Sequence, residues 1–314
     1  MEEVKAFTYD NGSKAFTADY SEHYAMIEKF AKQFIFNVQS ANPLQWIDKG
    51  VVDNGVAIEE AMVKLLDSSE WISESQDGSN LNAPSYPEIL VQYFSTWNGK
   101  QFKTTVSEDQ IRKVLLSGGD DMDVARMIVA SLTESEGHED YKESKGLLLS
   151  AIQAKNILAY GGDTPTVVDV SSNLIIQIKN MTDEFQFVNN SYLGYAKVNP
   201  SANYQTRTPF NRIRIIMPYT VYNKMNVDVL ASLYNLEKAE LLGRISLIDE
   251  GTKVFVIDEM GLGKWRRLYK MTSKYVEDAL YSNYWLTLSR MYTSCNLFKM
   301  GYIETSAEGN TTAL

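Results

Sequence analysis

The segment from Asp258 to Lys264 has the residue types and spacing that most suggest chemistry. It reads Asp-Glu-Met-Gly-Leu-Gly-Lys, with glycines just before a lysine. Glycine-rich turns that end in a lysine bind phosphates, because backbone N–H groups and the ammonium group point at the same anion. Such a phosphate loop also needs a hydroxyl residue directly after the lysine to hold magnesium, and Trp265 stands there instead.

Two further observations count against a phosphate loop. Asp258 occupies the position of the first glycine of the loop, and only about fifty residues follow Lys264. The segment is similar to the nucleotide-binding signature of the Swi2/Snf2-type helicase motors, which need more residues after it for their metal-binding and motor elements. We therefore expect a turn between two strands, in which glycine supplies a positive φ. A nucleotide hydrolase that uses residues 258–264 remains the enzymatic alternative.

The other reactive residues are few or scattered. One cysteine, Cys295, excludes a disulfide within the chain, and with two histidines it excludes a zinc site of the Cys/His type. Cys295 lies in an apolar stretch and is expected to be a small buried hydrophobic residue. Neighbouring carboxylates, such as Glu59 and Glu60, are expected to be surface groups or helix caps. We therefore expect no catalytic residues, no cofactor and no metal.

The charge balance argues against two classes of partner. The chain has 30 basic and 40 acidic residues among 314, a net charge of −10. Binding of a phosphate backbone needs Lys or Arg at each phosphate, so firm binding of nucleic acid is not expected. No apolar run approaches the ~20 residues of a membrane helix, so we expect no membrane partner.

Hydrophobic periodicity predicts a mixture of helices and strands without a regular βαβ order, which favours the α+β class. Helices are expected at 21–37, from Asp120 through Leu132, at 139–155, at 174–185 and at 227–234. Strands are expected at 51–66, 89–106, 166–170, 212–217, 244–248, 254–257 and 281–302.

Two of the predicted strands, 51–66 and 89–106, flank a polar stretch from Asp67 to Pro87. Strands of this length in an extended arm cannot bury a core of their own, so they need a neighbouring chain. Tyrosine clusters such as Tyr281 and Tyr284 are consistent with either a core or an interface, because tyrosine combines apolar area with a polar group. The sequence has no clear catalytic motif but has extended segments and amphipathic aromatic residues. This combination favours a self-assembling structural protein over an enzyme.

Several segments resemble, in order and spacing, the major capsid proteins of small short-tailed phages of the Bacillus phage phi 29 type. The resemblance spans roughly residues 40–300. It rests on Asn42-Pro43-Leu44, Lys49-Gly50, Gly55, Ile58-Glu59-Glu60, Phe102, Thr105, Asp109, the apolar pair 114–115, Asn226 to Ala231, Asn235, Leu242-Gly243, Ile248-Asp249 and the aromatic stretch Tyr281 to Cys295.

The resemblance implies the Hong Kong 97-type capsid fold. It implies an N-terminal arm and helix at 1–41, an extended hairpin (the E-loop) at 50–107, a peripheral domain with a spine helix at 108–170 and 271–303, an axial domain at 171–270, and a C-terminal tail at 304–314. The type member carries a C-terminal immunoglobulin-like domain, which we expect to be absent here. The chain also starts directly at the arm, so we expect a separate scaffolding protein.

The implied function is that of a major capsid protein, not an enzyme. Such a protein self-assembles as pentamers and hexamers into an icosahedral or elongated head that encloses double-stranded DNA. The expected partners are other copies of the chain, the scaffolding protein, the portal protein and weakly, non-specifically contacted DNA. The expected location is the virion, after assembly in the host cytoplasm. A cellular nanocompartment shell of the same fold is the structural alternative.

The hairpin from Val51 to Val106 is expected to lie on the adjacent subunit, because two apolar and aromatic strands flank a polar tip. Its large aromatic side chains are the candidate inter-subunit contacts. They are Trp71, Tyr86, Tyr93, Phe94 and Trp97.

Overall fold

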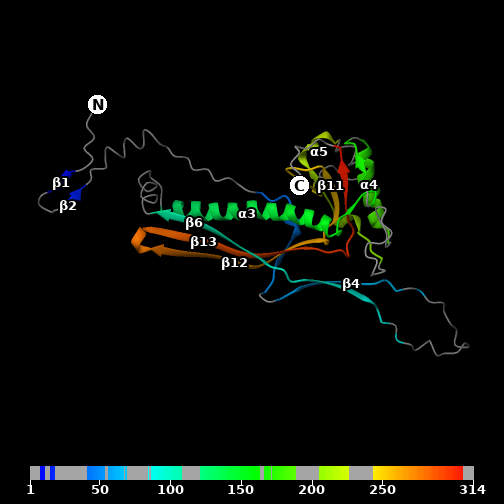
Figure 1. Cartoon of the computed structure of the whole chain (residues 1–314), viewed down its shortest axis with the longest axis horizontal. Helices are drawn as coiled ribbons and strands as arrows, with labels where there is room; N and C mark the ends of the chain where they lie inside the picture. Colours follow the sequence, from blue (N-terminus) through cyan, green and yellow to red (C-terminus); the bar gives the residue numbers. More distant parts are fainter. Residues whose placement is uncertain are drawn as a thin grey trace, which may run out of the picture. The chain divides into compact units, whose positions relative to one another are not determined.

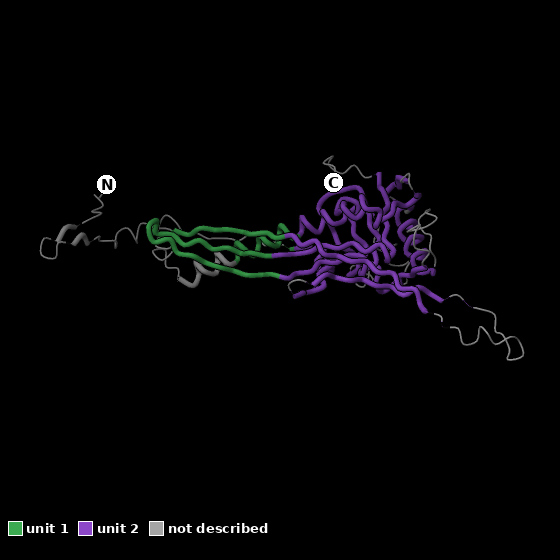
Figure 2. The backbone as a smooth tube through the Cα atoms, turned by 60° about the horizontal axis from the view of Figure 1, so that its bottom comes forward, with its two compact units in different colours: residues 1–41, 99–140, 268–288 green, residues 42–98, 141–267, 289–314 purple. Residues whose placement is uncertain are grey.

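The computed structural model describes two compact units. One comprises residues 1–41, 99–140 and 268–288, and the other comprises residues 42–98, 141–267 and 289–314 (Figure 2). Within them, the described residues are 8–10, 15–17, 41–53, 56–66, 68, 84, 86–107, 121–162, 166–170, 172–188, 205–225 and 243–306. The helices predicted at 21–37 and 227–234 lie outside the described residues.

The second unit is built on a six-stranded sheet. Its strand order is β10 (Ile245–Ile248), β9 (Ile213–Pro218), β11 (Lys253–Asp258), β14 (Met300–Thr305) and β7 (Leu158–Ala159), and β8 (Val167–Val168) also pairs with β14. The pairing is mixed, since β9 runs parallel to β10 and antiparallel to β11. Strands β7 and β8 both run parallel to β14.

Both faces of this sheet are buried, as the alternation along β11 shows. Val254 and Val256 belong to one core cluster, whereas Phe255 and Ile257 belong to another. Successive side chains of a strand point to opposite faces, so a strand buried on both faces is a continuous apolar run. Helix α4 (Ser172–Gln186) lies beside the sheet (Figure 1). It packs into the first cluster through four fully buried side chains. They are Leu174, Ile178, Met181 and Phe185.

The opposite face of the sheet is covered by the last turns of α3 (Asp121–Gln153) and by the short helix η1 (Gln45–Ile47). Leu147, Leu148 and Ala151 of α3 are buried there. Leu44 and Ile47 add two side chains that are each 1% exposed. The short helix α5 (Tyr219–Lys224) follows β9 directly, on the α4 side, with Val221 in the first cluster.

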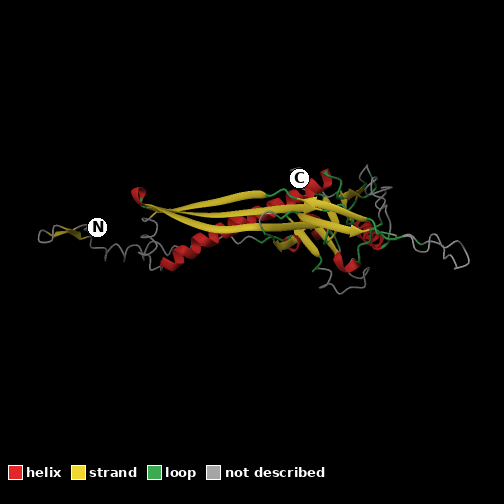
Figure 3. Ribbon diagram, turned by 90° about the horizontal axis from the view of Figure 1, so that it is seen from below, coloured by secondary structure: helices red, strands yellow, loops and turns green. Residues whose placement is uncertain are grey.

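The first unit contains parts of three long strands. Strands β3 (Asp48–Val51), β12 (Leu262–Val276), β13 (Tyr281–Ser294) and β6 (Asn98–Ser107) form a four-stranded sheet in that order. Figure 3 shows the long strands of the protein side by side. Thr105 donates a hydrogen bond of 2.6 Å to Asn283, which joins β6 to β13 by side chains as well. Lys100 forms an ion pair with Glu139 of α3. Two further strands, β1 (Thr8–Asp10) and β2 (Ala15–Thr17), pair antiparallel.

Several predicted elements are wrong in their extent. The two helices predicted on either side of Glu136 form one helix, α3. The strand predicted at 281–302 ends at Ser294, turns, and resumes as β14 in the other sheet. The strand predicted at 89–106 is divided into β5 (Ile89–Phe94), which pairs with β4 (Ile58–Val63), and β6, which pairs in the sheet of β13.

Candidate functional site

The antiparallel hairpin β4–β5 belongs to neither large sheet. Its two strands pair only with each other among the described strands, with Ile58 opposite Phe94 and Val63 opposite Ile89. Side chains of a strand alternate between two faces, so this register assigns each residue to one face of the ribbon.

The inner face of the hairpin packs on the turn after β13. Met62, Leu90 and Phe94 are partly buried against Cys295 and Leu297, which are 1% and 5% exposed. The side-chain oxygen of Gln92 accepts a hydrogen bond of 3.1 Å from the backbone N–H of Asn296. The inner face is therefore held by both apolar contacts and a hydrogen bond that spans much of the sequence.

The outer face of the hairpin is apolar and open. Its exposed side chains are Ala61, Val63, Ile89, Val91 and Tyr93, with Glu59 opposite Tyr93. Val63 is 58% exposed and Ile89 is 56% exposed. A two-stranded ribbon with a second apolar face gains from burial of that face, at about 25 cal/mol per Å². Within the described residues of the hairpin, this apolar face is exposed.

A carboxyl and a thiol face each other at the base of the inner face. Burial raises the pKa of Glu60, while the hydrogen bond from the Cys295 thiol and the charge of Lys49 act in the opposite direction. Burial raises the pKa of Cys295 as well. Burial lowers the pKa of Lys49, against the attraction of Glu259, Glu60 and Asp258. Glu60, Cys295 and Lys49 thus form a half-buried contact between the hairpin and the rest of the unit. The thiol of Cys295 has a raised pKa, so it is not an activated nucleophile.

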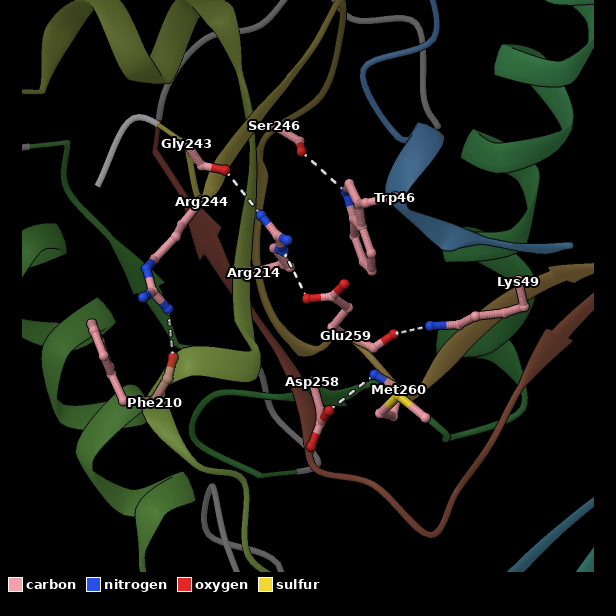
Figure 4. A network of polar contacts seen from close by, with 10 residues as sticks. All are labelled: Trp46, Lys49, Phe210, Arg214, Gly243, Arg244, Ser246, Asp258, Glu259 and Met260. Atoms are coloured by element: carbon pink, nitrogen blue, oxygen red, sulfur yellow. Dashed lines mark hydrogen bonds and ion pairs between the residues drawn. The ribbon is translucent and has the colours of Figure 1, made fainter. Parts of the chain in front are cut away.

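The segment Asp258 to Lys264 forms a tight turn between β11 and β12 that is held by charged side chains (Figure 4). Asp258 is fully buried, forms an ion pair of 2.5 Å with Arg212, and accepts a hydrogen bond of 2.8 Å from Thr208. Its second oxygen accepts the backbone N–H of Met260 at 3.0 Å. Lys49 donates to the carbonyl oxygen of Glu259 at 2.9 Å.

The neighbouring strands add to the same polar network (Figure 4). Arg214 donates to the carboxylate of Glu259 at 3.1 Å and to the carbonyl oxygen of Gly243 at 2.9 Å. Trp46 donates its ring N–H to Ser246 at 3.1 Å. The charged side chains drawn in Figure 4 therefore all have hydrogen-bond partners within the same chain, which is typical of a network that stabilises the fold.

The predicted turn is confirmed, but its glycines serve another purpose. Neither Gly261 nor Gly263 has a positive φ. A Cβ on Gly261 would lie 2.5 Å from the sulfur of Met300, and a Cβ on Gly263 would lie 2.6 Å from Oγ1 of Thr293. Close packing therefore excludes a side chain at both positions.

The chain continues from this turn as strand β12, whereas a phosphate loop opens a helix. Lys264, which would have to reach a phosphate, is 4% exposed and lies 3.4 Å from Asp48. The nucleotide-hydrolase interpretation of residues 258–264 is therefore wrong.

The structure separates the five predicted contact residues into groups. Tyr86 and Tyr93 are 84% and 66% exposed, so both are available to a neighbouring chain. Phe94 is on the inner face, and Trp97 lies 4.8 Å beneath the guanidinium of Arg267. Trp71 lies outside the described residues. The inner-face residue Gln92 is not among the predicted contacts, although the alternation of β5 places it on the same face as Phe94.

The described ranges hold neither a metal site nor a membrane-spanning helix. Within them, no three His, Cys, Asp or Glu side chains are grouped as a metal site. No helix among those residues has the length and apolar composition needed to cross a membrane. The features that remain are surfaces, above all the outer face of the hairpin.

Comparison with protein families identifies the kind of protein. A family model described as phi29-like phage major capsid protein matches residues 11–299. The chain belongs to this family. Phi29-like capsid proteins are structural components of the virion capsid and are not enzymes. The family resemblance drawn from the sequence is thereby confirmed.

Individual relatives of this phi29-like capsid protein are distant. The major capsid protein of Bacillus phage GA-1 is 23% identical over 270 residues, which are 84% of this chain and 56% of that protein. The corresponding protein of Bacillus phage PZA is 22% identical, over 84% of this chain and 60% of that protein. The chain thus matches less than two thirds of the length of these curated relatives.

Solved structures show the fold of this phi29-like capsid protein. A chain in the capsid of Staphylococcus phage Andhra superimposes with a TM-score of 0.69 at 12% identity, over 88% of this chain and 87% of that chain. A capsid chain of cyanophage P-SCSP1u gives a TM-score of 0.55 at 10% identity, over 88% and 92%. The chain has the Hong Kong 97-type capsid fold, of mixed α and β structure.

Proposed function

We propose that this chain is the subunit that builds the closed head of a tailed phage, as pentamers and hexamers around double-stranded DNA. The observation that carries the proposal is the hairpin β4–β5, which packs one face on its own body and leaves a second apolar face exposed. Head-to-tail contacts between identical chains close into rings when the rotation between neighbours is suitable. The family model and the capsid structures support this function.

The domain plan implied by the resemblance is part of the proposal. The E-loop would comprise residues 50–107, with β4 and β5 as its paired strands. The peripheral domain would comprise 108–170 and 271–303 and would contain α3 as its spine helix. The axial domain would comprise 171–270, with α4 packed against the six-stranded sheet.

The hairpin would lie on the adjacent subunit through its outer face. Of the predicted contacts that the structure describes, Tyr86 and Tyr93 are exposed. Val63, Ile89 and Val91 lie on the same face of the hairpin as Tyr93. Aromatic side chains are frequent anchors of such interfaces, because they bury a large area with few rotatable bonds. Phe94 and Trp97 would act indirectly, by holding the hairpin at its base.

Further partners follow from the proposed role. A scaffolding protein would guide the curvature of the shell, and a portal protein would occupy one vertex. A net charge of −10 suits a container whose wall contacts packaged DNA weakly and non-specifically.

Electron microscopy with light scattering would test the proposal on the purified protein, with and without its scaffolding protein. Uniform closed shells are the expected result, and persistent monomers under both conditions would contradict it. A deletion of residues 70–86 should leave a folded protein that does not close shells. Normal particles from the deletion variant would exclude the hairpin as the assembly element.

A further inference from the structure

A carboxyl group lies inside the contact that attaches the hairpin β4–β5 to the rest of its unit. It belongs to Glu60, which is opposite Gln92 in the register of the two strands. Alternation places both residues on the inner face with Met62 and Phe94, which pack beside Cys295. Among the described strands, β4 and β5 pair only with each other, so the attachment of the hairpin depends on this inner face.

The carboxyl group of Glu60 has fewer hydrogen-bond donors than an ionised carboxylate needs. The thiol of Cys295 donates one hydrogen bond to it. Its Oε2 oxygen is buried and accepts no hydrogen bond from the described residues. A carboxylate removed from water is costly unless donors surround it, whereas a neutral carboxyl group is much cheaper to bury. The docked hairpin therefore favours the protonated form of Glu60.

One cation faces this carboxyl group from β3, but it is shared. The ammonium group of Lys49 attracts Glu60 and donates a hydrogen bond of 2.9 Å to the carbonyl oxygen of Glu259. Lys64 and Glu88 form an ion pair of 3.1 Å with each other, so their charges largely cancel. The charged groups that act on Lys49 are Glu259, Glu60 and Asp258, which attract it, and Arg212, which repels it.

The balance of these surroundings makes docking of the hairpin depend on pH. Burial raises the pKa of Glu60 above its ordinary value of 4.5, against the smaller opposing effects of the Cys295 thiol and the charge of Lys49. A group whose pKa is raised on docking binds a proton when it docks. Docking is therefore most favourable below pH 4.5 and weakens as the pH rises through the pKa of the docked state.

We propose that Glu60 is a proton-operated latch for the hairpin. When protonated, it holds the inner face on the turn after β13, and its ionisation loosens that contact. The latch is a property of the single chain, and only its role in shell assembly rests on the proposed function. It gives the proposed assembly element an attachment whose strength follows the pH.

The two groups beside Glu60 do not produce the same pH dependence. Burial raises the pKa of the Cys295 thiol, so the thiol stays protonated in the docked state at neutral pH. Burial lowers the pKa of Lys49 from 10.5, so its titration makes docking more favourable as the pH rises, which is the opposite direction. The difference between the wild type and a Glu60 variant therefore isolates the latch.

Labelling of Cys295 measures docking, because the hairpin packs over this thiol and the chain has no other cysteine. The full chain, kept too dilute to assemble, is treated with a dipyridyl disulfide reagent at several pH values. Each rate is divided by that of the urea-unfolded chain at the same pH, which removes the reactivity of the thiol itself. From about pH 5 to about pH 8, protection of the wild type should fall roughly threefold or more. Protection of Glu60→Gln should stay constant.

Two control variants separate the latch from a merely structural contact. Glu59→Gln is the same chemical change one residue earlier, on the exposed outer face, and should keep the wild-type profile. Gln92→Ala removes the hydrogen bond of 3.1 Å from the backbone N–H of Asn296. It should lower protection at every pH without changing the pH dependence. Parallel profiles of wild type and Glu60→Gln, or a flat profile of Glu59→Gln, would overturn the latch.

Amide hydrogen exchange of the wild type tests the latch without any variant. Protection factors of β4 and β5, corrected for the intrinsic exchange rate, should fall between about pH 5 and about pH 8, while those of α4 should change less. An equal change in the hairpin and in α4 would overturn the latch.

Microscopy of the same samples at assembly concentration separates the latch from the shell function. Particles from a chain whose protection does not depend on pH would overturn the latch and leave the shell function standing. Protection that falls with pH in a chain that never forms particles would support the latch and contradict the shell function.

Discussion

Tyr93 and Phe94 are neighbours in β5, yet their side chains lie on opposite faces of the hairpin. Tyr93 is 66% exposed, whereas Phe94 packs on the cluster of Cys295 and Leu297. The strand geometry thus places an exposed tyrosine directly beside a phenylalanine that fixes the hairpin to its own body.

Substitution of these two neighbours should separate folding from assembly. Tyr93→Ala should change the free energy of unfolding by less than about 0.5 kcal/mol, as is usual for exposed sites, but should abolish or strongly delay shell formation. Phe94→Ala should destabilise by about 1–3 kcal/mol, less than for a fully buried phenylalanine. Hydrogen exchange of the amides in β4 and β5 should accelerate only in Phe94→Ala. Equal effects of both variants on folding would contradict the assignment of faces.

The space around two glycines, Gly263 in β12 and Gly146 in α3, predicts effects of opposite sign on the free energy of unfolding. Gly263→Ala should destabilise by about 1–3 kcal/mol, because its Cβ would meet Thr293. Gly146→Ala, where nothing lies within 4 Å of the new Cβ, should stabilise by about 0.5–1 kcal/mol in the middle of α3. Urea unfolding of both variants measures this. A Gly263→Ala protein as stable as the wild type would contradict the prediction and show that Thr293 can move away from the added Cβ.

Asp258→Asn should leave Arg212 beside a neutral partner in a buried site. Removal of one member of a fully buried ion pair costs about 3–5 kcal/mol. Arg212 retains 34% exposure, so we expect about 2–3 kcal/mol. The exposed Glu250→Gln is the control with the same chemical change and should be neutral. Calorimetry would decide, and equal melting temperatures of the two variants would show that the Arg212 pair contributes nothing.

Lys299 predicts a dependence of stability on alkaline pH. Its side chain is 0% exposed and donates a hydrogen bond of 2.7 Å to the carbonyl oxygen of Phe187, and burial lowers its pKa from 10.5 to about 8. Between these two values the unfolded chain binds more protons than the folded chain, so the free energy of unfolding should rise with pH.

Comparison with Lys299→Met isolates this effect. The difference in the free energy of unfolding between wild type and variant should grow in favour of the wild type from pH 8 to pH 10.5, and should be constant below about pH 7. Urea unfolding at several pH values provides the measurement. A difference that stays flat through this range would show that Lys299 titrates normally.

The sequence alone was sufficient to predict an element where its buried residues follow the regular spacing of a helix. Leu174, Ile178, Met181 and Phe185 predicted α4, and all four are fully buried. The same kind of reasoning failed at 281–302, because the apolar run continues through Cys295 and no glycine or proline marks the turn. What ends β13 is tertiary: the backbone N–H of Cys295 donates to the carbonyl oxygen of Gly261, 2.8 Å away.

The hairpin could be predicted as an arm, but its two faces required the register. Side chains around Tyr93 alternate between the two faces of the strand. Only the pairing of β4 with β5 and the position of Leu297 show which of these faces is covered. Likewise, β6 follows β5 closely in sequence but pairs in the sheet of β13, a choice that depends on residues nearly 180 positions away. The residues of a strand do not by themselves indicate which distant strand it pairs with.

The single cysteine has a practical consequence for the study of head growth. Cys295 is 1% exposed, and burial raises the pKa of its thiol, so at neutral pH it reacts slowly with alkylating reagents. A cysteine introduced at an exposed hairpin position, such as Ser68, would then be the site that takes up a fluorescent dye. The native chain thus needs no cysteine removal before energy transfer between dyes can follow, in real time, how neighbouring copies meet.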